Sequence, residues 1–183
     1  MPSLDASHTV RSLVTRRRWL QRRFELGLAP DAFPDVIERL RGTPVRLEER
    51  TRRLPPDVLT RRLGDDWSIQ ENVGHLLDLE PLWECRLDDL LAGELELREA
   101  DLTNRATHEA NHNDANPRTL LSDFRGTRER IVIRLESLAE DQLAHSALHP
   151  RLKEPMTVVD LFFFVAEHDD HHLARITEIL RSG

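Results

Sequence analysis

The sequence predicts an all-α protein, an up-and-down four-helix bundle with an extra N-terminal arm or short helix. Four segments carry apolar residues at helical spacing, and mostly long connectors separate them. Only seven of the 183 residues are glycine and 32% are charged, which suits solvent-facing helices better than a glycine-punctuated β-fold. A chain of this length is typical of one domain with a substantial core. We therefore expect a basic arm over residues 1–30 and a bundle domain over residues 31–183.

The N-terminal arm is a basic segment on an acidic chain. Residues 1–25 contain six arginines and two carboxylates, whereas the whole chain carries a net charge of −7. Apolar residues over 10–24 predict a short amphipathic helix. We favour a terminal helix that packs on the domain or on a second subunit. The alternative is a segment that contacts phosphates or a membrane surface.

The first bundle helix is expected from residue 33 or 35 to residue 53. Pro55 and Pro56 follow directly and stop it, because proline cannot continue the helical hydrogen-bond pattern. Pro44 lies inside the segment, so we expect a kink or a short break beside it.

The second helix begins at Ser68. Ser68 and Glu71 have the form of a capping box, in which the hydroxyl and the carboxylate each bond a backbone N–H of the first turn. Pro81 predicts a bend inside the helix. Gly93 is a suitable C-terminal residue, because glycine readily adopts the left-handed conformation.

The remaining half of the chain predicts two further helices. A polar connector over residues 94–117 leads into a helix over residues 118–138, and a second connector occupies residues 139–156. Thr157 caps the last helix, with Asp160 at its third position. A polar connector as long as 94–117 is usually functional or partly helical.

The last helix carries the strongest chemical signal, a face of apolar residues interrupted by His168 and His172. These residues recur at intervals of three and four and therefore lie on one side of the helix. Leu161, Val165, His168, His172, Ile176 and Ile179 make up this face. A buried imidazole without a partner costs about 1–3 kcal/mol, and a metal ion is the economical shared partner for two of them.

His75 on the second helix is the candidate third ligand. Side chains from facing helices build metal sites inside bundles. Three neutral imidazoles suit Zn²⁺, Ni²⁺ or Fe²⁺ and leave a position open for water or substrate, as in catalytic zinc sites. The alternative is a group of core histidines bonded to backbone or carboxylate groups.

Several nearby residues could support the ligands or contact a substrate. Glu71 and Asp78 lie one turn either side of His75, and His171 lies on the polar flank of the last helix. The carboxylates that flank His168 are expected mainly at the solvated surface. Glu80 falls on an apolar stripe and needs a partner inside the bundle, whereas Cys85 lies off that stripe and is expected to be neither ligand nor nucleophile.

His108-Glu109-Ala110-Asn111-His112 matches the H-E-x-x-H pattern of zinc peptidases literally. In that class, the motif lies on a buried helix with apolar neighbours. Here the neighbours are polar and Pro117 follows, so we expect nothing to bury the motif and disfavour the peptidase interpretation. The remaining role for His108 and His112 is in a loop that closes over the metal site and contacts substrate.

Two motifs resemble the DinB-like (DinB/YfiT) metalloenzyme family. They are WSIQENVGHLLD at residues 67–78 and EHDDHHLARI at residues 167–176, and the resemblance extends over about residues 33–181. It implies a four-helix bundle, often homodimeric, with zinc or nickel on His75, His168 and His172. Relatives with assigned activity include S-transferases that use mycothiol or bacillithiol, and mycothiol-dependent maleylpyruvate isomerases. The H-E-x-x-H stretch is outside the family pattern.

The leading functional hypothesis is therefore a metal-dependent S-transferase, in which a low-molecular-weight thiol attacks a small electrophilic substrate. The alternatives are a metal-dependent hydrolase at the same site and a non-catalytic bundle with a structural metal. The acidic net charge disfavours a nucleic-acid partner. The absence of a long apolar run and the single cysteine, Cys85, favour a protein of the reducing cytoplasm that does not enter the membrane.

Overall fold

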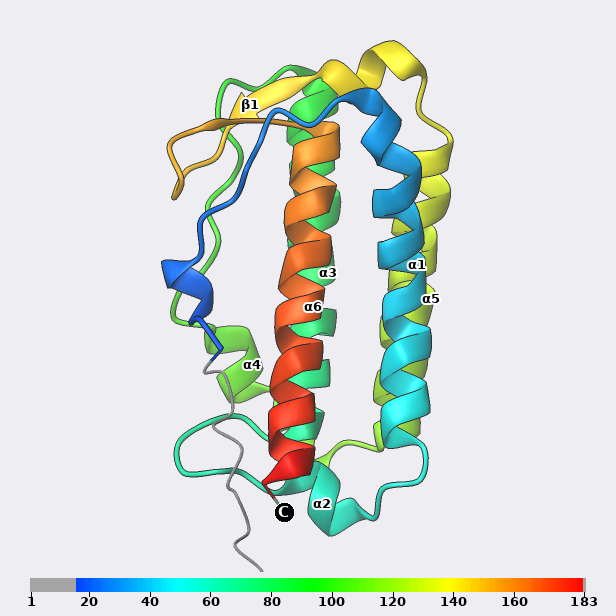
Figure 1. Ribbon diagram of the computed structural model, residues 1–183, viewed down its shortest axis with the longest axis vertical. Helices are drawn as coiled ribbons and strands as arrows, with labels where there is room; N and C mark the ends of the chain where they lie inside the picture. The colour runs from blue at the N-terminus through cyan, green and yellow to red at the C-terminus, as the bar shows by residue number, and fades with distance from the viewer. Residues whose placement is uncertain (1–15, 183) are drawn as a thin grey trace, which may run out of the picture.

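The protein is a four-helix bundle, as the sequence predicts (Figure 1). The computed structural model describes residues 16–182. Within these residues no helix is both long and apolar enough to cross a membrane. The bundle consists of α1 (Phe33–Thr51), α3 (Ile69–Ala92), α5 (Pro117–Glu136) and α6 (Val158–Arg181). The shorter elements are α2 (Pro56–Thr60), α4 (Arg105–Glu109), β1 (Ser146–Leu148) and β2 (Pro155–Thr157).

The helix directions are set by the long connector between α3 and α5. This connector runs back along the bundle, so that α3 and α5 rise in the same direction while α1 and α6 descend (Figure 1). The packed pairs are α3 with α5, α5 with α1, α1 with α6 and α6 with α3. Helices that follow one another in the chain are therefore not always neighbours in space, a feature beyond the predicted up-and-down description. His75 on α3 consequently faces α6.

The helix ends follow the predicted local rules. Ser68 and Thr157 form complete capping boxes with Glu71 and Asp160, respectively. Gly93 ends α3 in the left-handed conformation at φ 77°. The prolines inside α1 and α3 do not end these helices, so the short break considered for Pro44 does not occur.

The second connector contains structure that the sequence did not predict. A short 3₁₀ helix over Glu140–Ala144 precedes β1, which pairs antiparallel with β2. Leu97 of the first connector also donates a backbone hydrogen bond to Leu148 of β1, at 3.0 Å. The hairpin and the first connector thus form one end of the bundle.

The described part of the N-terminal arm packs on α6 as an extended segment, not as the expected helix. Only Trp19–Gln21 form a short 3₁₀ turn, and residues 10–15 of the expected helix lie outside the described residues. Arg22 pairs with Glu167, and the backbone N–H groups of Gly27 and Leu28 donate to Asp160. These contacts agree with the favoured interpretation, an arm that packs on the domain.

A polar layer divides the apolar core into two clusters. It contains one residue from each bundle helix: Thr43, Glu80, Arg128 and Asp169, all at most 1% exposed. Apolar residues of one cluster precede each of these positions, and apolar residues of the other cluster follow it. The two apolar clusters are therefore joined through this polar layer.

Arg128 holds the polar layer together. It donates to Glu80 at 2.6 and 3.0 Å and pairs with Asp169 as well. Thr43 donates to Asp169 at 2.8 Å. Burial alone would lower the pKa of Arg128, but the two carboxylates raise it overall. Glu80 thus has the partner that it needs. The carboxylates beside His168 were expected at the solvated surface, and this expectation is wrong for Asp169, which is completely buried.

Replacing Arg128 with methionine should strongly destabilise the fold. The change leaves two buried carboxylates without their cation, at a cost of about 3–5 kcal/mol. Urea denaturation of the wild type and the variant measures this difference. Arg125→Met is the matched control, because Arg125 pairs with Glu48 at the exposed surface of the same helix and should cost less than about 1 kcal/mol. Equal costs for the two variants would contradict the assigned role.

Glu71→Gln should make stability less sensitive to acid. Burial raises the pKa of the Glu71 carboxyl, but hydrogen bonds from Arg62 and Ser68 lower it overall to about 2. Because this value is below the ordinary value of 4.5, the carboxylate stabilises the fold above that pH and the contribution is lost as the pH falls toward 2.

The measurement is the free energy of unfolding in urea across that acid range. The free energy of unfolding of the wild type should exceed that of Glu71→Gln by a constant amount near neutral pH. This difference should shrink on acidification. Glu49→Gln, which removes an exposed partner of Arg52, is the control and should change little. A Glu71→Gln difference that stays constant down to about pH 3 would contradict the account.

Candidate metal centre

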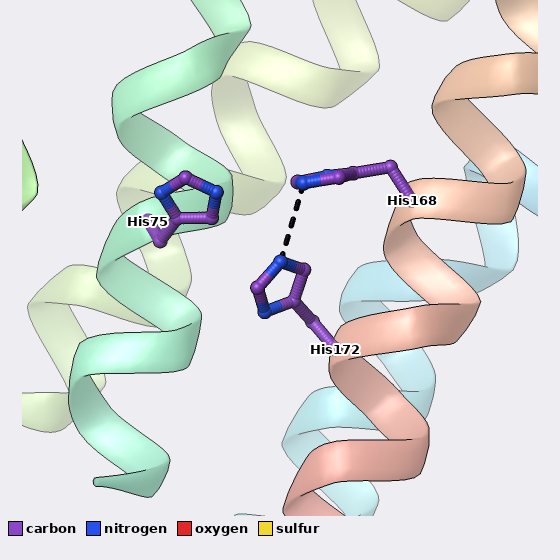
Figure 2. Close-up of side chains that lie close together, drawn as sticks. All are labelled: His75, His168 and His172. Carbon is purple, nitrogen blue, oxygen red and sulfur yellow. Dashed lines mark hydrogen bonds between the residues drawn. The ribbon is translucent and has the colours of Figure 1, made fainter. Parts of the chain in front are cut away.

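Three buried histidines meet between α3 and α6. His75 comes from α3, and His168 and His172 lie one turn apart on α6, on opposite sides of a small gap (Figure 2). One ring nitrogen from each residue lies within 4.8 Å of the other two. The side chains are 4–7% exposed. The structure therefore brings together the three histidines that the helical spacing and the family resemblance indicate.

The environment keeps all three imidazoles neutral. Burial lowers the pKa of His75 to about 4 and holds the pKa values of His168 and His172 well below the ordinary value. Neighbouring imidazoles and, for His168, the guanidinium of Arg128 act in the same direction. Neutral rings retain a lone pair, which is the form that binds a metal ion.

Asn72 fixes the orientation of His172. The amide nitrogen of Asn72 donates to the carbonyls of Trp67 and Ser68, at 3.2 and 2.7 Å. The amide oxygen must then face His172 Nδ1, 2.8 Å away, and accept its proton. Nε2 of His172 is left with its lone pair toward the other histidines.

A hydrogen-bonded chain fixes His75 in the same way. Thr107 donates its hydroxyl proton to Asp78 at 2.8 Å, so its oxygen accepts from His75 Nδ1 at 3.1 Å. The lone pair of His75 is therefore on Nε2. His112 also bonds Asp78, with its Nε2 at 2.9 Å from the carboxylate. Such partners behind a ligand normally hold its tautomer and raise its affinity for metal.

His168 is the one histidine of the cluster whose Nδ1 has no hydrogen-bond partner among the described residues, although this atom is buried. Its Nε2 lies 3.2 Å from His172 Nε2. Two nitrogen ligands of a tetrahedral zinc ion, each about 2.0–2.1 Å from the metal, are separated by about 3.3 Å. The donor set and this spacing fit a divalent metal ion.

The H-E-x-x-H stretch does not form a zinc-peptidase site. α4 ends at Glu109, and Asn111 has a left-handed φ of 50°, so His108 and His112 do not share one helix. His108 is exposed beside Trp67, whereas His112 is 7% exposed. The expectation that nothing buries the motif is therefore wrong for His112.

Gly74 explains how this loop docks on α3. A Cβ at Gly74 would overlap the ring of His112, so the absence of a side chain allows the ring to lie against the helix. Thr107 is buried in the same contact. The connector thus covers the histidine cluster from the α3 side.

Two other residues singled out in the sequence have different partners. The Glu71 carboxylate bonds Ser68 and Arg62 and completes the cap of α3. The His171 ring lies beside Trp19 and contacts the guanidinium of Arg16. Burial and the arginines of the arm lower the pKa of His171 to about 4.

The histidines form part of the wall of a cavity of about 530 Å³. Three tryptophans, Trp19, Trp67 and Trp83, also line it, together with Phe164. Sequence reasoning missed Asn72, Thr107 and the aromatic wall. Asn72 lies one turn before His75, which is a usable signal, whereas Thr107 reaches the site only because the connector folds back.

Thr107→Val should weaken metal binding at the histidines. The change removes the oxygen that accepts the His75 Nδ1 proton, and loss of such a partner typically costs about 10- to 100-fold in affinity. Competition with a chromophoric chelator measures the affinity for Zn²⁺. Thr103→Val is the control, because the Thr103 hydroxyl bonds only Asp101 at the surface. Equal affinity in Thr107→Val and the wild type would contradict the role of Thr107.

Comparison with solved structures identifies two proteins of similar fold. YfiT from Bacillus subtilis, described as a probable metal-dependent hydrolase with an unusual four-helix bundle topology, superposes with a TM-score of 0.77. The identity is 22%, over 88% of this chain and 93% of YfiT. A mycothiol-dependent maleylpyruvate isomerase superposes with a TM-score of 0.63 at 12% identity, over 81% of this chain and 61% of the isomerase. Both likenesses concern the fold.

Sequence comparison identifies the family. No curated protein matches the chain significantly. The model of the DinB superfamily, however, matches residues 39–176, which include both motifs of the resemblance in full and all three clustered histidines. The match covers well over half of the chain. The protein therefore belongs to the DinB superfamily.

Proposed function

We propose that the protein is a metal-dependent enzyme that transfers a low-molecular-weight thiol to a small electrophilic substrate. The observation that carries the proposal is the convergence of three neutral imidazoles at the wall of one cavity. The hydrogen bonds at Nδ1 of His75 and His172 leave the lone pair of each ring on Nε2, where it is free to bind an ion. Zn²⁺ or Ni²⁺ suits this donor set.

The chemistry follows from the charge of the ligands. Three neutral histidines leave the charge of a divalent cation uncompensated, so the free position favours an anionic ligand. Bound there, such a cation lowers the pKa of a coordinated thiol or water and makes it a nucleophile at neutral pH. His75, His168 and His172 would hold the ion, and the hydrogen bond with Thr107 orients the His75 ring.

The cavity wall supports a small organic substrate. Its volume of about 530 Å³ is within the range of small-molecule sites, and aromatic side chains form much of its lining. Trp67 lies 4.6 Å from the His75 ring, and Trp19 lies 4.8 Å from the His168 ring, centre to centre. These rings flank the histidines with apolar surface and reduce the access of water.

Hydrolysis is the second candidate function. It is favoured by the likeness to YfiT, which is described as a probable metal-dependent hydrolase. The same histidines would then serve to activate water. No carboxylate among the described residues bonds the three rings directly, since Asp78 acts through Thr107. Thiol transfer would depend less on such a base, because a metal-bound thiol is deprotonated outright, whereas metal-bound water keeps a pKa of about 7.

The purified protein should contain about one divalent metal ion per chain. Elemental analysis should show that His168→Ala and His75→Ala lose it, because each removes one of three ligands. His145→Ala is the matched control, since His145 bonds the Leu90 carbonyl in another part of the bundle. Metal retained by both cluster variants, or lost equally from the control, would contradict the site.

Turnover separates the candidate functions. Cofactor thiols, including mycothiol and bacillithiol, should react with a chlorinated aromatic acceptor faster in the presence of the metal-loaded wild type than with His168→Ala. Thiol-independent cleavage of an ester would favour the hydrolase. A chelator that abolishes folding, and not only activity, would indicate a structural metal.

A further inference from the structure

Arg86 is a buried cation without a carboxylate partner. Its side chain comes from α3, lines the same cavity as the histidines and is 1% exposed. It donates to the carbonyl of Arg98 at 3.0 Å, and it makes no ion pair within residues 16–182. The nearby carboxylate of Asp89 is bound to Arg98 instead. A buried guanidinium of this kind normally has an anionic partner.

Arg151 provides a second unmatched cation in the same cavity. It lies in the turn between β1 and β2, and its Nη2 is buried without a hydrogen-bond partner in the described part of the chain. Its guanidinium lies over the ring of Phe164, 6.0 Å from the centre. The Phe164 ring lies 5.3 Å from the ring of His149, centre to centre, and His149 Nε2 lies 3.2 Å from Arg86 Nη1, so both guanidinium groups border the same part of the cavity.

His149 gives an independent sign that an acceptor belongs between these groups. Its Nδ1 receives the backbone N–H groups of Arg151 and Leu152, at 3.1 and 3.2 Å, while its Nε2 lies 3.2 Å from Arg86 Nη1. All three neighbours are donors. A neutral imidazole has one lone pair and one N–H, so either tautomer leaves a donor facing a donor. An anionic oxygen beside Arg86 would relieve this mismatch.

The other arginines of the cavity are already neutralised. Arg16 pairs with Glu178, and Arg175 pairs with both Asp66 and Glu178. Arg86 and Arg151 therefore differ from Arg16 and Arg175 in that they have no carboxylate partner among residues 16–182.

We propose that Arg86 and Arg151 form a subsite for the carboxylate of the substrate. The identification of the ligand as substrate rests on the proposed function. Planar guanidinium groups match a carboxylate in shape and charge. Trp83 lies between this subsite and the histidines, with its ring 5.6 Å from the Arg86 guanidinium and 6.1 Å from the His168 ring. The substrate class is thus a small acid whose apolar body packs on Trp83 and whose reactive group reaches the histidines.

The test is calorimetric titration of metal-free protein with benzoate and with benzamide, its uncharged counterpart. Benzoate should bind saturably and benzamide should not. Arg86→Met and Arg151→Met should each weaken benzoate binding about tenfold or more, since each removes a charged hydrogen-bond partner. Arg175→Met is the matched control, a cavity arginine with its own carboxylates, and should leave the affinity nearly unchanged. Arg86→Lys serves if Arg86→Met fails to fold, and should also bind benzoate more weakly.

Three outcomes of the titrations with metal-free protein would overturn the proposal. They are equal binding of benzoate and benzamide, absence of saturable benzoate binding, and an affinity that the Arg86 and Arg151 variants leave unchanged. Binding that appears only with zinc would place the carboxylate on the metal and would also overturn it. Benzoate should bind to His168→Ala with the same affinity as to the metal-free wild type. This readout needs neither metal nor turnover, so its failure is distinguishable from a failure of the proposed enzyme activity.

Discussion

The buried ion cluster around Arg128 is the interaction on which the rest of the structure depends. It takes Thr43, Glu80, Arg128 and Asp169 from the four bundle helices, one from each, and lies between two apolar clusters that cannot themselves specify how the helices are aligned. Asp169 directly follows His168 in α6. Holding Asp169 against Arg128 therefore fixes the rotation and height of α6, and with them the direction of His168 and His172 toward α3.

Two neighbouring groups of buried polar residues in this bundle differ in their charge state. The Arg128 cluster is ionised, because a guanidinium and two carboxylates compensate one another. The histidines are neutral, because burial lowers the pKa of each imidazole, and Arg128 acts in the same direction on His168. Elsewhere along the wall of the cavity, Arg86 and Arg151 have no carboxylate partner among residues 16–182. The cavity thus combines neutral histidines at one side with unmatched positive charge at the other, an arrangement that suits an acidic ligand.

Local sequence rules predicted the parts of the site that depend on one helix, and failed where a connector is involved. His168 and His172 are one turn apart, and the Ser68 and Thr157 caps are set within four residues, so spacing alone was sufficient. His75 could be proposed as third ligand, but its contact with Thr107 requires the connector to fold back over α3. The burial of His112 depends in the same way on Gly74. The parallel course of α3 and α5, and the pairing of β1 with β2, are likewise tertiary outcomes that carry no periodic signal.

X-ray absorption spectroscopy of the zinc-loaded protein tests the central claim most directly, because it reports which atoms surround the ion. The zinc ion should have about three nitrogen neighbours at about 2.0–2.1 Å, with the outer scattering pattern of imidazole rings, and one exchangeable oxygen ligand. Addition of a thiol should introduce a sulfur neighbour at about 2.3 Å. A shell composed of carboxylate oxygens, or one that is unchanged in His75→Ala, would contradict a metal centre built from these three histidines.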